Sequence, residues 1–356
     1  MANGYGIVKS AYLPASLIAS SGEFSCPTVQ LSLEQYAAVA HATTPFISIY
    51  PWSPGFGSKY SDPATLPAST GRSVAFSPAA NNVAVAGATT PFINTYPWSA
   101  SGFGSKYSNP GTLPASNGRG VTFSPFGDTI AVAHETSPRV SVYPWSSGYG
   151  TKYSNPGTLP TGTGLGIAFS EAGDYISVSH ATSPFVSTYP WSAGFGAKFS
   201  DPGTLPAGQG DGVRFSPSGS DIVIAHSNTP FVSAYPWSGS GYGSKYSNPG
   251  TLPTADGRSA WFDPSGTALA IGFSDSAGLY VYAWSSGFGS KFSDPGSSPG
   301  AGGLGAAFGN SGTSIAASLG ASPYVAAYVW SGSGFGSRYS DPATLPAGVG
   351  FGFAFG

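Results

Sequence analysis

Charge, cysteine and long apolar runs are all scarce in this sequence of 356 residues. Only 8% of the residues are charged and the formal net charge is −2. No basic patch is therefore large enough to hold a polyanion by counterion release, and nucleic acid is not expected as a partner. The single cysteine, Cys26, excludes an internal disulfide framework. No stretch approaches the roughly 18 consecutive apolar residues that would span a bilayer, so we expect no membrane span.

A secretion signal is also poorly supported. Within residues 1–21, Pro14 interrupts the apolar residues and Lys9 supplies the only positive side chain. This pattern makes a poor signal peptide. We expect a protein made in the cytoplasm without one.

Glycine and proline are abundant instead. The chain holds 52 glycines and 32 prolines, a composition that disfavours helices. Its hydrophobic fraction of 40% is nevertheless enough to bury a core. The composition thus favours β-structure rich in turns.

Seven of the eight tryptophans recur at intervals of 46 or 47 residues. Self-similarity at that period predicts a propeller or a solenoid. The repeated residues are Trp52, Trp98, Trp145, Trp191, Trp237, Trp284 and Trp330.

Each repeat contains four strand signals. A short apolar strand such as 121–123 leads through a Ser-Pro-x-Gly turn to a second strand, 129–134. A third strand, such as 184–191, ends at the tryptophan. Gly-Phe/Tyr-Gly then opens a fourth extended piece that ends at Asn-Pro or Asp-Pro, where proline suits an outer edge.

Four short antiparallel strands per repeat predict one propeller blade. Packing the blades around an axis buries faces that a lone sheet would leave wet, and small residues crowd the first two strands while aromatic residues fill the outer two. The sequence therefore predicts an all-β fold, a seven-bladed β-propeller of four-stranded antiparallel blades over residues 24–356, preceded by an arm or anchor over residues 1–23.

The motif Phe-Ser-Pro-Ser-Gly at 215–219, the Ile-Ala-His strand after it and the aromatic third strand resemble the WD-repeat and YVTN-type propellers. The resemblance covers roughly residues 25–356 and implies the propeller fold. It implies nothing firm about function, because propellers host many unrelated activities. Third strands end in Tyr-Pro-Trp, not Trp-Asp, and the chain has no Gly-His dipeptide.

Ring closure is predicted from the C-terminus. Residues 345–356 align without gaps to residues 66–77 and stop after the first strand of an eighth copy. Blade 1 begins clearly only at Gln35, so the terminal strand is expected in its innermost position. A competing candidate for that position is residues 28–32, around Val29.

Three sets of residues repeat around the ring, and each has a structural explanation. The four histidines share one position at the end of the second strand and are His41, His134, His180 and His226. Neighbouring blades lie about 10 Å apart, which is too far for these residues to be ligands of one metal ion. We therefore expect the histidines to be hydrogen-bonded. The basic residues Lys59, Lys106, Lys152, Lys198, Lys245, Lys291 and Arg338 lie on the outer edge, where charge discourages aggregation, with lateral docking as the alternative. The turn aromatics Phe56, Phe103, Tyr149, Phe195, Tyr242, Phe288 and Phe335 are expected to pack between blades, with sugar or protein binding as the alternative.

Positions where the repeats disagree are the candidate binding site. Charged and bulky residues occur at and just inside the start of the innermost strand, near the expected central channel, where propeller ligands usually bind. Neutral variation at wet positions is the competing explanation. The candidate binding residues are Arg72, Arg119, Asp211, Arg214, Arg258, Trp261 and Phe351.

Catalytic signatures are missing from the sequence. We find no phosphate-binding glycine loop, no metal-ligand cluster and no Gly-x-Ser-x-Gly elbow. Asp211 could approach Asp256 or Asp263 only through folding. We therefore predict no catalytic residue, no cofactor, no metal site and no enzyme.

The low charge and the near-regular Gly/Ser/Thr/Ala-rich repeats resemble, in style, bacteriophage virion proteins of the tail, head-fibre or decoration type. We therefore expect a non-enzymatic structural or docking protein that meets protein subunits of a larger assembly and a host-surface glycan or protein. Alternatives are a lectin-like glycan-binding propeller and a glycosidase or lyase propeller. The predicted anchor residues are Tyr5, Ile7, Tyr12, Leu13, Leu17 and Ile18.

Overall fold

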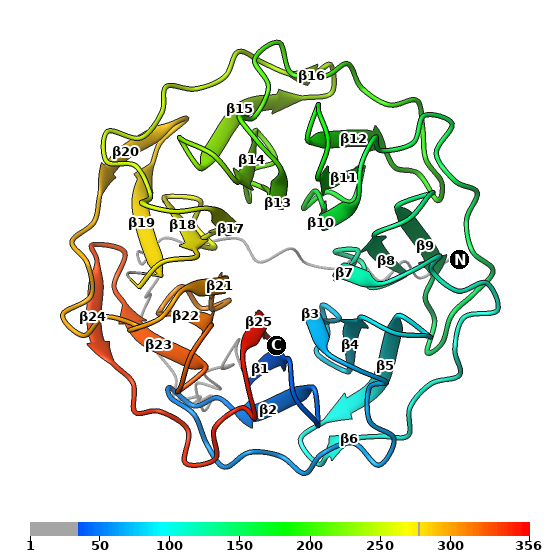
Figure 1. Cartoon of the computed structure of the whole chain (residues 1–356), viewed down its shortest axis with the longest axis vertical. Helices are drawn as coiled ribbons and strands as arrows, with labels where there is room; N and C mark the ends of the chain where they lie inside the picture. The colour runs from blue at the N-terminus through cyan, green and yellow to red at the C-terminus, as the bar shows by residue number, and fades with distance from the viewer. Residues whose placement is uncertain (1–34, 277) are drawn as a thin grey trace, which may run out of the picture. The chain divides into compact units, whose positions relative to one another are not determined.

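The computed structural model describes residues 35–276 and 278–356, and every regular element among them is a β-strand. The strands form seven antiparallel sheets, the blades, arranged around one axis (Figure 1). None of the described residues forms a helix of the length and hydropathy needed to cross a membrane. The predicted all-β, seven-bladed propeller is confirmed.

Each blade runs from an innermost strand outward, and the strands at each level follow in the order of blades 1 to 7. The innermost strands are β25 (Gly350–Phe355), β3 (Gly71–Phe76), β7 (Gly118–Phe123), β10 (Gly164–Phe169), β13 (Gly210–Phe215), β17 (Gly257–Phe262) and β21 (Gly303–Phe308). The second strands are β1 (Tyr36–His41), β4 (Asn82–Gly87), β8 (Thr129–His134), β11 (Tyr175–His180), β14 (Asp221–His226), β18 (Ala268–Phe273) and β22 (Ser314–Leu319). The third strands are β2 (Ile47–Pro51), β5 (Ile93–Ser99), β9 (Val140–Pro144), β12 (Val186–Pro190), β15 (Val232–Ser238), β19 (Leu279–Trp284) and β23 (Val325–Trp330).

The fourth strand differs in length between blades. It spans four residues in blades 6 and 7, as β20 (Phe288–Lys291) and β24 (Phe335–Arg338), and two in blades 2 and 5, as β6 (Gly102–Phe103) and β16 (Gly241–Tyr242). Blades 1, 3 and 4 keep a single bridge from the tryptophan to the turn aromatic. The prediction of four strands holds in blades 2, 5, 6 and 7, and is wrong for the outermost strand of the other three.

Proline explains why only blades 6 and 7 form four-residue fourth strands. In blade 1 the carbonyl of Pro51 accepts a hydrogen bond from the amide of Gly57, at 2.9 Å, so the backbone of residue 51 faces the fourth segment. Proline has no N–H to return, which removes a ladder hydrogen bond. Blades 1 to 5 all carry proline at this position, whereas blades 6 and 7 carry Ala283 and Val329 and form the longest fourth strands.

The C-terminal strand closes the ring, as predicted. β25 pairs with β1, with Ala354 opposite Ala38, and lies between the innermost strands of blades 7 and 2 (Figure 1). The carbonyl of Gly356 accepts hydrogen bonds from the amides of Gln35, at 2.7 Å, and Tyr36, at 3.0 Å. The competing segment around Val29, the predicted boundary at residue 23 and the six anchor residues all lie outside the described residues.

A β-bulge begins every innermost strand. In blade 2 the register shifts between Gly71 and Ser73, which leaves Arg72 without a partner opposite it. A Cβ on Gly71 would lie 2.3 Å from the carbonyl oxygen of Phe46, so no other residue fits there. Glycine occupies this position in all seven blades, and a Cβ would lie 2.1–2.7 Å from a carbonyl oxygen in each. The bulge therefore recurs wherever the glycine recurs.

The core lies between the blades. The second strands are almost wholly buried. The third-strand tyrosines reach across to the preceding blade; the Tyr50 hydroxyl donates to the Thr344 carbonyl at 2.8 Å. Innermost strands of adjacent blades pack backbone to backbone, since a Cβ on Gly120 would lie 2.9 Å from the Leu165 carbonyl oxygen. This close approach positions residues of different blades beside one another near the axis.

Candidate functional site at the propeller axis

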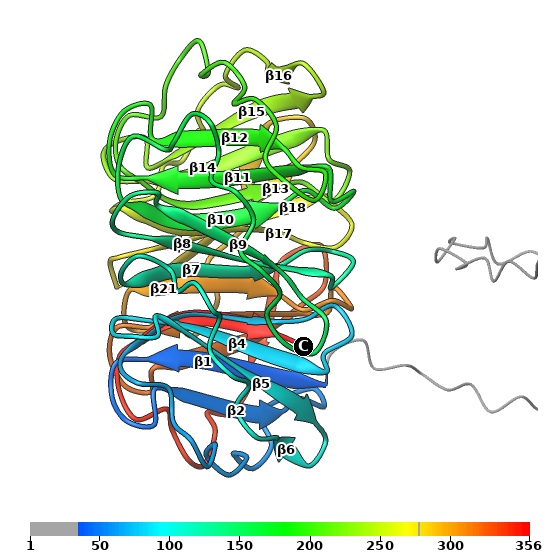
Figure 2. The ribbon, with the colours of Figure 1, turned by 90° about the vertical axis from the view of Figure 1, so that its right-hand side faces the viewer.

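The bulges bring seven residues, which we call the axial ring, to one face of the propeller. The innermost strands all point the same way (Figure 2), so their first residues lie at the same face. Bulges commonly redirect a side chain next to functional sites. In order around the axis the axial ring consists of Phe351, Arg72, Arg119, Leu165, Asp211, Arg258 and Leu304, all partly exposed.

One arc of the axial ring joins carboxylates from two blades through a shared arginine. The Arg258 guanidinium lies 3.3 Å from Asp211 Oδ2 in blade 5 and 3.3 Å from Asp256 Oδ2. Gln209 Nε2 donates to the other Asp211 oxygen at 2.9 Å. Folding thus brings Asp211 and Asp256 to the same arginine.

Burial raises the pKa of Asp211, while Gln209 and Arg258 oppose the shift by stabilising the charged form. The positive charge of Arg119, which lies two blades away, also acts to lower the pKa of this carboxyl. Asp211 is therefore a carboxylate with increased basicity, surrounded by cations. A perturbed carboxylate with a specific charged partner is a candidate functional residue.

The opposite arc is basic. Arg119 Nε donates to Glu135 Oε1 at 2.7 Å, and Asn117 holds the second oxygen of Glu135 at 3.1 Å. The Arg72 guanidinium lies 4.8 Å from the centre of the Phe351 ring, a cation–π contact across the closing seam. No carboxylate among the described residues forms an ion pair with Arg72. Burial lowers its pKa, and the charge of Arg119 lowers it further.

Two predicted site residues form a separate pair. Arg214 and Trp261 occupy equivalent positions in blades 5 and 6, and the guanidinium lies 3.5 Å from the ring centre. They lie three residues beyond Asp211 and Arg258 in sequence, which is about 10 Å along a strand. The structure therefore separates this pair from the axial ring. Asp263 lies beyond the strand end, where its Oδ1 accepts from the Ala268 amide at 2.6 Å, away from Asp211.

The histidines are structural, as predicted. All four are fully buried, and each Nε2 lies 3.0–3.1 Å from a serine hydroxyl seven residues later. Burial lowers the pKa of His41, His134 and His180 to about 4, and lowers that of His226. No group of three or more potential metal ligands occurs in the described part of the chain. The serine partners were missed from the sequence, although the spacing of seven was a usable signal.

The outer rings also have structural roles. Lys59 forms an ion pair with Asp62, three residues on, and its side chain is only 14% exposed. The turn aromatic Phe56 packs edge-on against Trp52 at 5.1 Å, and Tyr339 of blade 7 does so from the other side at 5.2 Å. Each turn aromatic also packs against a buried cluster formed by two adjacent blades, which confirms the expected inter-blade packing.

Glu135, Asn117 and Gln209 are axial-ring partners that sequence reasoning missed. Each lies beside a repeated landmark, directly after His134 or directly before a bulge glycine. Their identity differs from blade to blade, which was the available signal.

Comparison with known proteins places the fold but no family. No protein-family model and no curated protein matches the chain. The periplasmic gluconolactonase PpgL of Pseudomonas aeruginosa is similar in structure, with a TM-score of 0.68 and 15% identity over 90% of this chain and 98% of that one. A putative 6-phosphogluconolactonase of Bacteroides uniformis has a TM-score of 0.68 at 13% identity, over 90% and 99% of the two chains. A Lactobacillus plantarum protein has a TM-score of 0.69 at 14% identity, over 90% and 99%.

The prediction of a non-enzymatic structural or docking protein is contradicted by these neighbours, two of which are described as lactonases. The expectation of a virion or WD-repeat protein has no support from a family model. Sequence reasoning failed on this point for a physical reason. The axial-ring residues come from different blades, about one repeat apart in sequence, so they form no local motif. The low charge of the chain reflects the packing of its blades and does not indicate whether the protein is an enzyme.

Proposed function

We propose that this protein hydrolyses a sugar lactone at the axial ring, with Asp211 as general base and Arg72, Arg119 and Arg258 as its cationic groups. The descriptions of two structural neighbours support the reaction class. The ring itself supports the location. The single observation that carries the proposal is Asp211, the one carboxylate of the axial ring, whose pKa is raised by burial.

The chemistry requires a base and a positive field. Asp211 removes a proton from water as the oxygen attacks the lactone carbonyl carbon, giving a tetrahedral oxyanion. Collapse of the oxyanion breaks the ring C–O bond, and the alkoxide takes the proton back to give the open hydroxy acid. The raised pKa of Asp211 increases the basicity of its carboxylate, as a general base requires.

The arginines supply fixed positive charge where negative charge develops. Arg258 is held between Asp211 and Asp256, and Arg119 is held by Glu135. Both therefore keep their positions without substrate. Arg72 has an aromatic neighbour in place of a carboxylate, which leaves its charge free to meet an oxygen of the substrate.

The experiment is a pH-stat assay of D-glucono-1,5-lactone hydrolysis above the spontaneous rate. We expect Asp211→Asn to lower kcat by about 10²-fold or more, within the usual range for a lost general base. Asp294→Asn is the matched control, because Asp294 pairs with Lys291 at the outer edge of blade 6 and other blades carry asparagine at its position. We expect it to change kcat by less than about threefold. A wild-type rate equal to the spontaneous rate, or an Asp211→Asn variant as active as wild type, would refute the proposal.

A further inference from the structure

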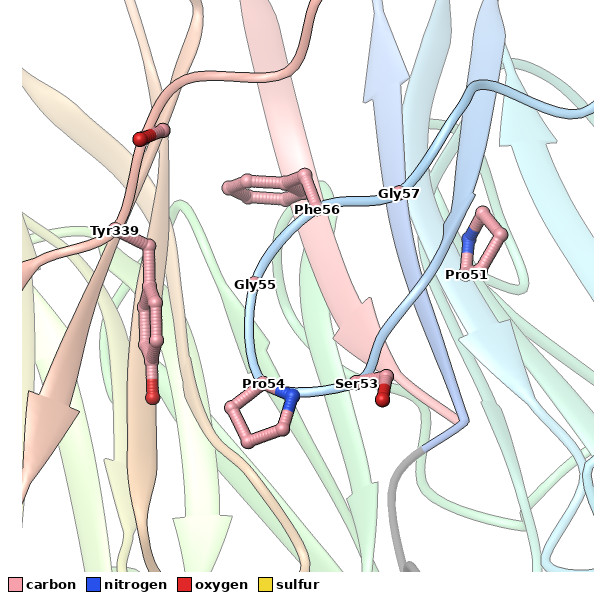
Figure 3. Close-up of a pocket in the computed structure, with 8 residues that line it drawn as sticks. Pro51, Ser53, Pro54, Gly55, Phe56, Gly57 and Tyr339 are labelled. Atoms are coloured by element: carbon pink, nitrogen blue, oxygen red, sulfur yellow. The ribbon is translucent and has the colours of Figure 1, made fainter.

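A pocket of about 320 Å³ lies at the outer edge of the ring, where blade 7 meets blade 1. This seam pocket is lined by Pro51, Pro54 and Phe56 of blade 1, by Tyr339 of blade 7, and by Ser53 and Ser340. Figure 3 shows Tyr339 facing the turn that carries Pro54 and Phe56. The volume of the seam pocket lies at the small end of the range found for ligand-binding pockets.

The aromatic rings of Phe56 and Tyr339 are both held in place by Trp52. Trp52 is buried, and Phe56 and Tyr339 each meet it edge-on, with ring centres 5.1 and 5.2 Å away and interplanar angles of 82° and 79°. Gly55 has φ +112, and a Cβ there would lie 3.6 Å from the Tyr339 ring, so the turn packs directly against that ring. The apolar surface is therefore rigid before any ligand arrives, which lowers the entropic cost of binding.

The side-chain hydroxyls of the seam pocket have no hydrogen-bond partner among the described residues. Neither the Tyr339 hydroxyl nor the hydroxyls of Ser53 and Ser340 make a side-chain hydrogen bond to another described residue. No charged residue lines the pocket. The described charged residues closest in sequence to the lining residues form ion pairs with each other, Lys59 with Asp62 and Arg338 with Asp341. The pocket thus offers stacking surfaces and hydroxyls without net charge.

We propose that the seam pocket binds one residue of a neutral saccharide. The C–H face of a sugar ring packs on aromatic and proline surfaces, and its hydroxyls exchange hydrogen bonds with serine and tyrosine. This site is distinct from the axial ring and does not depend on the hydrolysis proposed there.

Pro54 distinguishes this seam from the others. Equivalent turns of the same length in blades 3, 4 and 6 carry Ser147, Ala193 and Ser286 in its place. The seam of blades 3 and 4 provides the matched control, because Tyr153 meets Trp191 there at 5.2 Å just as Tyr339 meets Trp52. Pro54→Ala gives this turn the residue of blade 4, where Ala193 has φ +50, a backbone conformation that proline cannot adopt.

The probes are xylohexaose, cellohexaose, maltohexaose and chitohexaose, titrated into the full chain by calorimetry. We expect at least one to bind at one site per chain, with Pro54→Ala weakening binding about fivefold or more and Tyr339→Ala abolishing it. Tyr153→Ala should leave binding unchanged, and Pro54→Ala should leave lactone hydrolysis unchanged. Asp211→Asn, which tests the axial ring, should not affect saccharide binding.

Four outcomes would overturn the assignment. They are no binding of any probe, equal binding by Pro54→Ala, a stoichiometry near seven, and binding of a proline-rich peptide in place of every saccharide. Because blade 4 folds with alanine in this turn, we expect Pro54→Ala to fold, so that its loss of binding reflects the changed turn. Its unchanged melting temperature provides the check.

Discussion

Blade 3 and blade 7 fill the same interior position in different ways. In blade 3, His134 lies at the end of the second strand and Ser141 faces it at 3.1 Å. In blade 7 the corresponding residues are Leu319 and Ala326, both fully buried. The two positions change together in every blade, and the pairs are His41 with Ser48, Gly87 with Asn94, His134 with Ser141, His180 with Ser187, His226 with Ser233, Phe273 with Tyr280, and Leu319 with Ala326.

Except in blade 2, where Gly87 corresponds to the histidine and Asn94 is buried, this interior position holds a matched pair, which need not include histidine. A polar pair satisfies its own hydrogen bond, and an apolar pair removes the need for one. Phe273 and Tyr280 of blade 6 meet a third way, as aromatic rings 4.6 Å apart. Blades 3 and 7 also differ at the outer edge, where blade 3 has Pro144 and a single bridge while blade 7 has Val329 and a four-residue fourth strand.

The largest expected effect is on acid stability. The pKa of the blade 3 histidine is about 4 when folded and near 6.5 when unfolded, so the unfolded chain binds more protons between those values. Stability should fall as the pH drops from about 6.5 to 4 and then level off, by about 3 kcal/mol for each such histidine. Blade 7 contributes nothing in this window. Urea unfolding across the pH range measures the slope.

A variant with all four histidine–serine pairs replaced by leucine–alanine pairs sharpens this prediction. Its stability should lose the fall between pH 6.5 and 4 that the histidines cause, because no buried histidine remains to titrate. A slope as steep as that of the wild type would assign acid lability to other groups.

The next effect is the coupling within one pair. His134→Leu alone leaves the Ser141 hydroxyl buried without a partner, which costs about 1–3 kcal/mol. Adding Ser141→Ala copies the blade 7 pair and should recover much of that loss. A double-mutant cycle by chemical denaturation should give a coupling of about 1–3 kcal/mol. Additive effects would mean that the paired changes are coincidental.

The smallest effect concerns the outer strand. Pro144→Val gives blade 3 the residue type of blade 7 and restores an N–H toward the fourth segment. One hydrogen bond is worth about 0.5–1.5 kcal/mol, and the loss of proline rigidity offsets about 0.4–1. The net change should stay within about 1 kcal/mol.

Hydrogen exchange is the informative measurement for this substitution. In Pro144→Val the new backbone amide at position 144 should be protected, while Val329→Pro in blade 7 should lose protection at residues 335–338. An unprotected amide at position 144 would remove proline as the explanation for the short fourth strands.

Much of the fold was predictable because each repeat contains the local sequence patterns that specify its strands and turns. The spacing of the tryptophans, the strand and turn signals and the eighth-copy strand at 345–356 are local patterns, and together they specify seven blades and their closure. The bulge was not anticipated, although its glycine recurs in all seven repeats. Glycine is required at residue 71 because a Cβ there would lie 2.3 Å from the carbonyl oxygen of Phe46, which belongs to another segment of the chain.

Sequence alone determined which residues break the repeat, including Arg72, Asp211 and Arg258. Only the tertiary structure decided which of them meet. Arg72 contacts Phe351 from the far end of the chain, and Tyr339 borders the same pocket as Phe56. The physical reason is that strand propensity and turns act within a few residues, whereas the distance between side chains of different blades depends on how closely the inner strands pack and on the strand that closes the ring.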